Sequence, residues 1–142
     1  MAFSIKCGDI IRLSKVSYTD HPKYHLVLCA SENLFFIINS HINNSKHFYY
    51  NHLDCQVSLA KNPNHSFMQK EISYIDCSQI ADEVFSIEVE KMINSGTAEI
   101  CGSIDNSTIQ KIIYAVDKYA RFILPRKDLA IILKNLNEML IS

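Results

Sequence analysis

The clearest alternation of apolar and polar segments in the chain lies between residues 20 and 40. Two apolar runs, 26–30 and 34–38, are separated by the short polar segment Ser31–Asn33. Runs of this length around a short polar segment are typical of two antiparallel strands joined by a tight turn. We therefore predict a β-hairpin, in which antiparallel pairing brings the start of the first strand beside the end of the second.

Shorter apolar or alternating runs predict further strands in the first 85 residues. These runs cover residues 10–13, 55–59, 66–68 and 72–75, and residues 80–84 fit either a short strand or a helical turn. Polar segments containing Asn, Pro, Ser or Asp separate them, as expected for turns. Five or six short strands with polar turns predict a small, curled antiparallel sheet or barrel.

The period of the apolar positions changes after residue 85 and becomes helical. A short helix is predicted over 86–95, capped by Ser86 and ended by Gly96, and residues 98–104 fit either a strand or a connection. Asp105 or Asn106 is the expected cap of a second helix, and a third is predicted over Arg126–Leu140. Apolar residues repeat along one face of each of these two helices: Ile109, Ile112, Ile113, Val116, and Leu129, Ile132, Leu133, Leu136, Leu140.

Length and composition indicate one globular domain. The chain has 142 residues, of which 48% are hydrophobic and 20% charged. This is enough for one continuous core. We predict a single α+β domain over residues 1–142, mainly β-barrel over 1–85 and mainly helical over 86–142. The sequence has no run of about 18 apolar residues and no apolar leader at its start, so we expect a cytoplasmic protein without a membrane segment.

The cysteines and histidines do not form a known ligand pattern. The five cysteines are widely spaced, lack a CxxC pair and are odd in number, which argues against a disulfide framework and a zinc knuckle. Most lie among apolar residues, where a reduced cysteine behaves as a small hydrophobe. The spacing of His41, His47 and His52 matches no local metal signature. We therefore expect no metal and no cofactor.

Positive charge and imidazoles are concentrated in the first half of the chain. Residues 1–70 hold seven Lys and Arg against four Asp and Glu, a balance of +3, and all six histidines. Residues 71–142 hold seven against eleven, a balance of −4. The first half is therefore the candidate contact surface for a polyanion. Without a dense Lys/Arg cluster, such binding must be local.

The predicted hairpin gathers candidate groups at one rim. Lys23 and His25 alternate onto one face of the first strand, and Ser40 follows the end of the second strand. A cation, an imidazole and a hydroxyl together suit a phosphate. The alternative is that these side chains are merely the solvated ends of strands. Asp76, with Ser73 and Ser78, is interpreted as a group that forms turn hydrogen bonds.

Several segments resemble the MazF/PemK (CcdB-like) family of toxins. Gly8–Ile11 (GDII) matches the Gly-Asp-Ile-Val strand with which those proteins begin. Residues 23–28 (KYHLVL) are similar to the family's Arg-Pro-x-Leu-Val-Leu strand, and residues 37–40 (IINS) stand where the family has Pro-Ile-Thr/Ser. Residues 73–80 resemble the segment that introduces the family's late strand and helix. The resemblance covers roughly residues 8 to 80.

This resemblance implies an SH3-like barrel with accessory helices, a homodimer, and a sequence-specific endoribonuclease neutralised by a partner antitoxin. The family's Arg and its Thr/Ser, both implicated in cleavage, fall on Lys23 and Ser40. Lysine keeps the charge of arginine but loses its bidentate grip on phosphate. Two functions therefore stay open: an endoribonuclease toxin of a type II toxin–antitoxin pair, or a non-catalytic module of the same fold that binds protein or nucleic acid.

For the nuclease, we predict a metal-independent cleavage of mRNA by attack of a 2′-hydroxyl. His25 would act as base or acid, Lys23 would stabilise the charge on the phosphorane, and Ser40 would orient the phosphate. The polar segment 39–51 would stack aromatic residues on bases or pack back onto the barrel. His52 is interpreted as a surface histidine. The residues expected to contact RNA are Arg12, His21, His41, Lys46, His47 and Tyr49.

Overall fold

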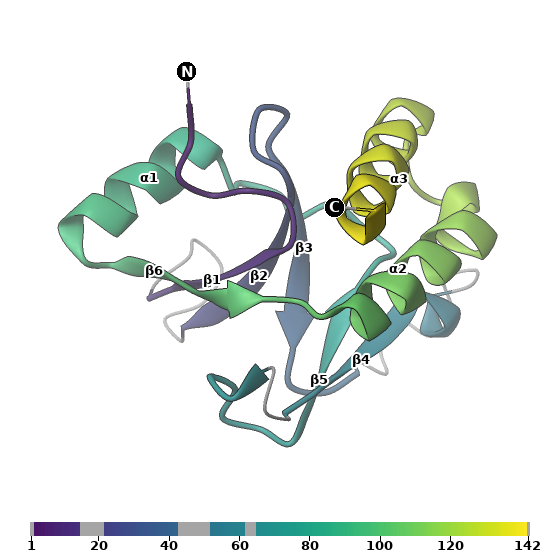
Figure 1. Cartoon of the computed structure of the whole chain (residues 1–142), viewed down its shortest axis with the longest axis horizontal. Coiled ribbons are helices and arrows are strands. Elements are labelled where there is room, and N and C mark those ends of the chain that lie inside the picture. Colours follow the sequence, from purple (N-terminus) through teal and green to yellow (C-terminus); the bar gives the residue numbers. More distant parts are fainter. Residues whose placement is uncertain (1, 15–21, 43–51, 62–64, 142) are drawn as a thin grey trace.

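Over the residues that the structure describes, the protein is an α+β structure with one six-stranded antiparallel sheet and three α-helices (Figure 1). The computed structural model describes residues 2–14, 22–42, 52–61 and 65–141. The strands are β1 (Asp9–Leu13), β2 (Lys23–Cys29), β3 (Leu34–Asn39), β4 (Gln56–Ala60), β5 (Ile72–Asp76) and β6 (Ala98–Ser103). The helices are α1 (Ser86–Ser95), α2 (Asn106–Lys118) and α3 (Arg126–Ile141).

The predicted hairpin is confirmed and lies at the centre of the sheet. The strand order is β4-β5-β3-β2-β1-β6, so β2 and β3 are the two middle strands. Tyr24 pairs with Ile38 and Leu26 with Phe36, which sets the start of β2 beside the end of β3. A central position suits these two apolar strands, because most of their residues are hidden from solvent on both faces of the sheet.

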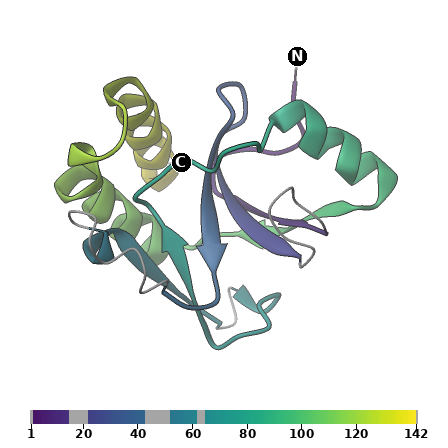
Figure 2. The ribbon, with the colours of Figure 1, turned by 180° about the vertical axis from the view of Figure 1, so that it is seen from behind.

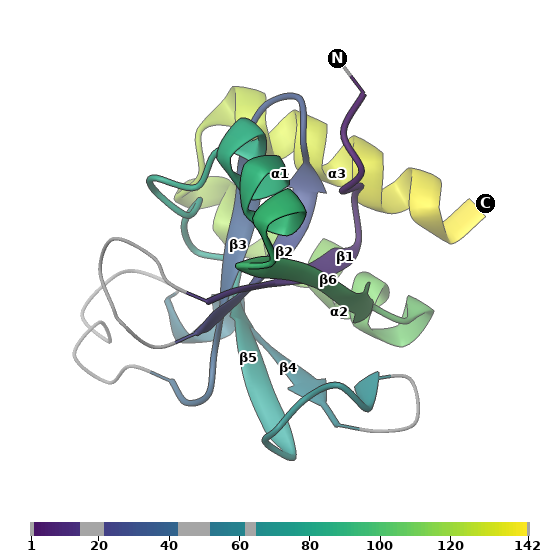
Figure 3. The same cartoon turned by 90° about the vertical axis from the view of Figure 1, so that its left-hand side faces the viewer.

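The sheet does not close into a barrel. Its edges are β4 and β6, and Figure 3 shows β4 and β5 extending away from β1 and β6. The closed SH3-like barrel is therefore not confirmed. The ambiguous segment 98–104 contributes β6, which pairs with β1 and extends the sheet into the mainly helical part of the chain. Residues 66–68 form a turn instead of the predicted strand, and residues 80–84 contain no strand.

Each face of the sheet carries its own apolar core, covered by helices (Figures 1 and 2). One core joins the sheet to α2 and α3, which contribute Ile109, Ile112, Val116, Ile132 and Leu136. The other joins it to α1 and the N-terminal segment through Val89 and Ile5. The helical periodicity predicted the buried residues of α2 and α3, because one apolar stripe per helix must pack on the sheet.

Local capping sets the ends of the helices. The Asp105 side chain accepts a hydrogen bond from the backbone N–H of Thr108, which confirms Asp105 as the cap of α2. Gly96 ends α1 with a φ of 84°, a conformation that favours glycine. Ser86 was wrongly predicted to cap α1: Phe85 is the cap residue, and the Ser86 hydroxyl donates to the carbonyl of Ala30.

All five cysteines are free thiols. Burial raises the pKa of Cys7 and Cys55 to about 12 and that of Cys101 to about 11, and it also raises the pKa of Cys77. These four thiols are therefore neutral and weakly nucleophilic at neutral pH. In the described part of the chain, no helix has the length and apolar character needed to cross a membrane.

Candidate functional site

Two cavities lie at the end of the sheet where β2 begins and β3 ends. The first, called here the Tyr24 cavity, is lined by Tyr24, Ile38 and Phe67 among others and has a volume of about 430 Å³. The second, called the Asp76 cavity, is lined by Ile37, Asn39 and Asp76 among others and has about 450 Å³. Ile38 belongs to one core and Ile37 to the other, so one cavity opens on each face of the sheet.

Lys23 and Ser40 line both cavities, so these two residues lie at one rim of the sheet, as predicted. Antiparallel pairing is the cause: the first residue of β2 lies across from the last residue of β3. The Lys23 ammonium donates a hydrogen bond of 3.0 Å to Asn39 Oδ1. Lys23 is half-buried, and burial lowers its pKa. Together these features hold a cation at the boundary between the two cavities.

His25 shares the strand face of Lys23 but lies inside the protein. Its exposed fraction is 0%, and it lines neither cavity. Burial, with a smaller effect from the charge of Lys23, lowers its pKa to about 4, so the imidazole is neutral at physiological pH. The alternation of side chains correctly placed His25 and Lys23 on one strand face, but it could not show that His25 is buried between its cross-strand neighbours Ile11 and Ile37.

His41 takes the place beside the hydroxyl. Its Nδ1 lies 3.2 Å from Ser40 Oγ, and it lines the Asp76 cavity with Lys23. Both Ser40 and His41 are exposed. Arg12 lies on β1 across from Tyr24 and Glu99 and is outside the lining of both cavities. Four residues expected to contact RNA lie outside the described residues: His21, Lys46, His47 and Tyr49.

A buried polar network forms the wall of the Asp76 cavity. Asp76 is 2% exposed, and its Oδ1 accepts hydrogen bonds from the Ser78 backbone N–H and hydroxyl and from Gln56 Nε2. Since the Ser78 hydroxyl proton points to Asp76, His52 Nδ1, 3.2 Å from Ser78 Oγ, is the donor to that oxygen. The expected turn role of Asp76 and Ser78 is confirmed. The surface interpretation of His52 is wrong, because this histidine is 4% exposed.

The Tyr24 cavity contains residues that the sequence did not single out. Phe67, Gln69 and Lys70 follow β4 in a turn that folds over the face covered by α2 and α3. Phe67 and Met68 are apolar residues within an otherwise polar segment, and this was the only signal that the turn packs inward. Ser73, grouped with Asp76 in the sequence, lines this cavity instead.

The two cavities differ in charge. Asp82 and Glu83 join Asp76 in lining the Asp76 cavity, whereas the described lining of the Tyr24 cavity holds two lysines and no carboxylate. Among the described residues, no group of three or more His, Cys, Asp or Glu is arranged to hold a metal. The Tyr24 cavity is therefore the better place for an anion.

Comparison with known proteins adds no relative: no family model matches the chain, and neither a curated protein nor a solved structure matches it significantly.

Proposed function

We propose that this protein binds single-stranded RNA across the Lys23–Ser40 rim and cleaves it without a metal, as a MazF/PemK-like endoribonuclease toxin with an open sheet in place of the closed SH3-like barrel. The observation that carries the proposal is the meeting of a half-buried ammonium, a hydroxyl and an exposed imidazole at one end of the β2–β3 pair. These are the groups that cleavage by a 2′-hydroxyl requires.

The roles follow from exposure and charge. His41 replaces His25 as the candidate base, because His25 cannot reach a substrate from inside the core. With its Nδ1 proton donated to Ser40 Oγ, His41 keeps a lone pair on Nε2 to accept the proton of the 2′-hydroxyl. The 2′-oxygen then bonds to phosphorus while the bond to the 5′-oxygen breaks. Lys23 stabilises the charge that accumulates on the phosphorane.

The products are a 2′,3′-cyclic phosphate and, after a proton reaches the leaving oxygen, a 5′-hydroxyl. Burial makes Lys23 a better proton donor than an exposed lysine, since it lowers the pKa of the ammonium. The same family resemblance extends the proposal to a homodimer in the cytoplasm and to a partner antitoxin that neutralises the toxin.

The second candidate is a non-catalytic module that binds RNA or protein through the same rim. The burial of His25 favours it, because the imidazole next to Lys23 on β2 is removed from the surface. Lysine at the position of the family's arginine favours it too, since a point charge positions a phosphate less strictly than a guanidinium.

One experiment tests both candidates. End-labelled, unstructured RNA is incubated in EDTA with the wild type, Lys23→Ala, His41→Ala and the control Lys111→Ala, whose lysine is exposed on α2. The nuclease predicts fragments with 5′-hydroxyl ends, lost in the first two variants and kept in the control. Binding that needs Lys23 but yields no fragments would support the module. RNA that is neither bound nor cut would refute the nuclease and the RNA-binding form of the module, and would leave a protein as the ligand of the rim. Growth after induction in a bacterial host provides the cellular counterpart.

A further inference from the structure

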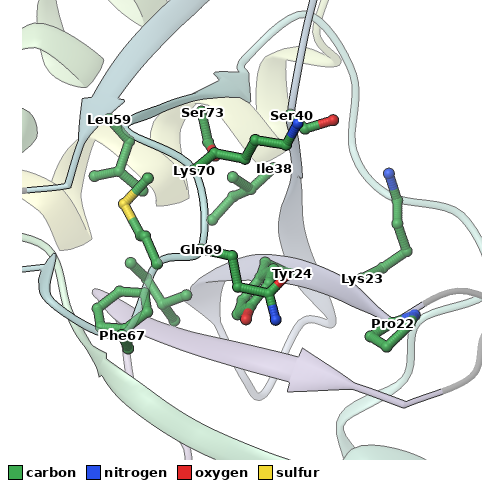
Figure 4. A pocket seen from close by; sticks show the side chains of 12 residues that line it. Pro22, Lys23, Tyr24, Ile38, Ser40, Leu59, Phe67, Gln69, Lys70 and Ser73 are labelled. Atoms are coloured by element: carbon green, nitrogen blue, oxygen red, sulfur yellow. The ribbon is translucent and has the colours of Figure 1, made fainter.

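The Tyr24 cavity has an apolar floor. Ile10, Ile38, Leu59 and Met68 line it from three strands and from the turn after β4, and all four are buried. Its volume of about 430 Å³ lies in the range of small-molecule sites. Figure 4 shows the cavity between the ring of Phe67 on one side and Tyr24 and Lys23 on the other. The space suits one flat, apolar group and excludes a duplex.

Two aromatic rings stand at this cavity, and one of them is held firmly. The centroids of Tyr24 and Phe67 are 6.5 Å apart. Phe67 packs edge-on against His65, at 6.2 Å, and lies over Gly102 of β6, where a Cβ would come within 3.0 Å of the ring. His65 is fixed in turn by hydrogen bonds to Ala60 and to the backbone N–H of Asp105. A preformed aromatic wall favours stacking of a base.

The rim of the cavity is suited to phosphate. Lys23 and Lys70 supply positive charge, and Ser40 and Ser73 supply hydroxyls. Figure 4 shows Ser73, Lys70 and Ser40 along the upper side of the cavity and Lys23 at its right, across from the apolar side chain of Phe67. This order, cations and hydroxyls outside with aromatic and aliphatic groups inside, matches a nucleotide, which has a flat base and a charged backbone. Single-stranded RNA presents such units, since its unstacked bases can turn outward into pockets.

Gln69 adds a group able to distinguish bases. It is exposed and lines the cavity, and Figure 4 shows its amide on the same side as Tyr24. A glutamine amide carries two N–H donors and an oxygen acceptor. Such an amide is able to pair with a base edge that offers a matching donor and acceptor, whereas stacking on an aromatic ring is tolerant of sequence.

We infer that the Tyr24 cavity receives one unstacked nucleobase of a bound RNA strand, stacked on Phe67 and selected by Gln69, with its neighbouring phosphates at Lys23 and Lys70. This inference rests on the RNA binding proposed above, and it holds for the nuclease and for the non-catalytic module. It makes Gln69 a specificity-determining residue.

The test uses labelled hexanucleotides of a single base, made as 2′-O-methyl RNA so that the attacking hydroxyl is absent. Affinities of the U, C and A hexamers are measured for the wild type, Gln69→Ala and the control Gln110→Ala, a glutamine exposed on α2. One base-edge pairing should separate the best and worst wild-type ligands by about fivefold or more. Gln69→Ala should reduce that range to about twofold or less, and Gln110→Ala should keep it.

Stacking is tested separately. Phe67→Leu should weaken all three hexamers by about fivefold or more, the lower end of the effect of one stacked base. The control Phe122→Leu, a ring that is 67% exposed, should leave them unchanged. A wild type that binds the three hexamers equally, or a Gln69→Ala variant that keeps the wild-type order, would overturn the assignment of Gln69. A Phe67→Leu variant with wild-type affinity would refute the inference that the Tyr24 cavity receives a base.

Two further measurements distinguish a failure of base selection from a failure of the proposed RNA binding, and distinguish an RNA strand from a free nucleotide as the ligand. If no hexamer binds, or if Lys23→Ala leaves every affinity unchanged, the proposed RNA binding at the rim fails. If Lys23→Ala weakens all hexamers while Gln69→Ala leaves their order intact, only the base selection fails. If a nucleoside 5′-monophosphate of the preferred base binds as tightly as its hexamer, the cavity is a site for a free nucleotide. That result would refute the binding of an RNA strand there.

Discussion

The buried His25 should make the stability of the protein depend on pH between about 4 and 6.5. In the unfolded chain this histidine titrates near pH 6.5, and in the folded protein burial lowers its pKa to about 4. Between these values the unfolded state binds the proton and the folded state does not. Falling pH therefore favours unfolding, and stability rises again as pH increases.

The size of the effect follows from the two pKa values. The full difference corresponds to about 3 kcal/mol once the pH lies below both values, and about 2 kcal/mol of it is lost between pH 7 and pH 5. The histidine is completely buried, so solvent does not screen the effect appreciably. Lys23 is the charged neighbour that adds to the effect of burial.

The assay is urea unfolding at pH 7 and pH 5 for the wild type, His25→Leu and the control His41→Gln. The free energy of unfolding of His25→Leu should fall by about 2 kcal/mol less than that of the wild type over this interval, whatever the other groups contribute. His41→Gln removes an exposed histidine and should retain the wild-type dependence. Equal losses in the wild type and His25→Leu would refute the reasoning, and would return His25 to the candidates for acid–base chemistry at neutral pH.

Substitutions at three further positions test packing and hydrogen bonds described above. Urea unfolding measures the stability of each variant, and RNA affinity is measured as well for the variant at Gly102. Asp76→Ala should lower the free energy of unfolding by about 3 kcal/mol, because it leaves the buried N–H and hydroxyl of Ser78 without their acceptor. Asp76→Asn keeps an oxygen and should lower the free energy of unfolding by less. Equal losses in the two variants would contradict this account. Asp105→Ala should cost about 1 kcal/mol through loss of the α2 cap, and no change would show that the cap is dispensable. Gly102→Ala should displace the ring of Phe67, and the loss of RNA-binding free energy should exceed the loss in the free energy of unfolding. Unchanged RNA affinity would show that Gly102 does not support the Tyr24 cavity.

Sequence reasoning was most successful where one periodicity decides the structure. The hairpin of β2 and β3 and the helices α2 and α3 were predicted nearly to their ends, since each has a long apolar pattern bounded by turn or cap residues. It failed for Ser66–Met68, where two apolar residues suggested a strand. These residues instead pack a turn onto the sheet, which is a tertiary effect that a short segment does not reveal.

The candidate site shows the same limit. Lys23 and Ser40 were placed together because strand pairing depends on sequence order alone. The burial of His25 and His52 depends instead on which distant segments cover them, and no local pattern of residues indicates those contacts. Lys70 and Gln69 were missed for a related reason: they reach the cavity through a turn whose path is set by the contact of Phe67 with Gly102 on β6.

The pairing of β1 with β6 has a consequence for how the chain folds. The strand over residues 9–13 can pair with its second neighbouring strand, residues 98–103, only after most of the chain has been synthesised. Contacts this far apart in sequence raise the contact order and slow folding. During synthesis the outer edge of β1 stays open to other strands, and an open edge invites aggregation. The completion of the sheet by β6 should therefore be a late step that ends a vulnerable stage in the life of the newly made protein.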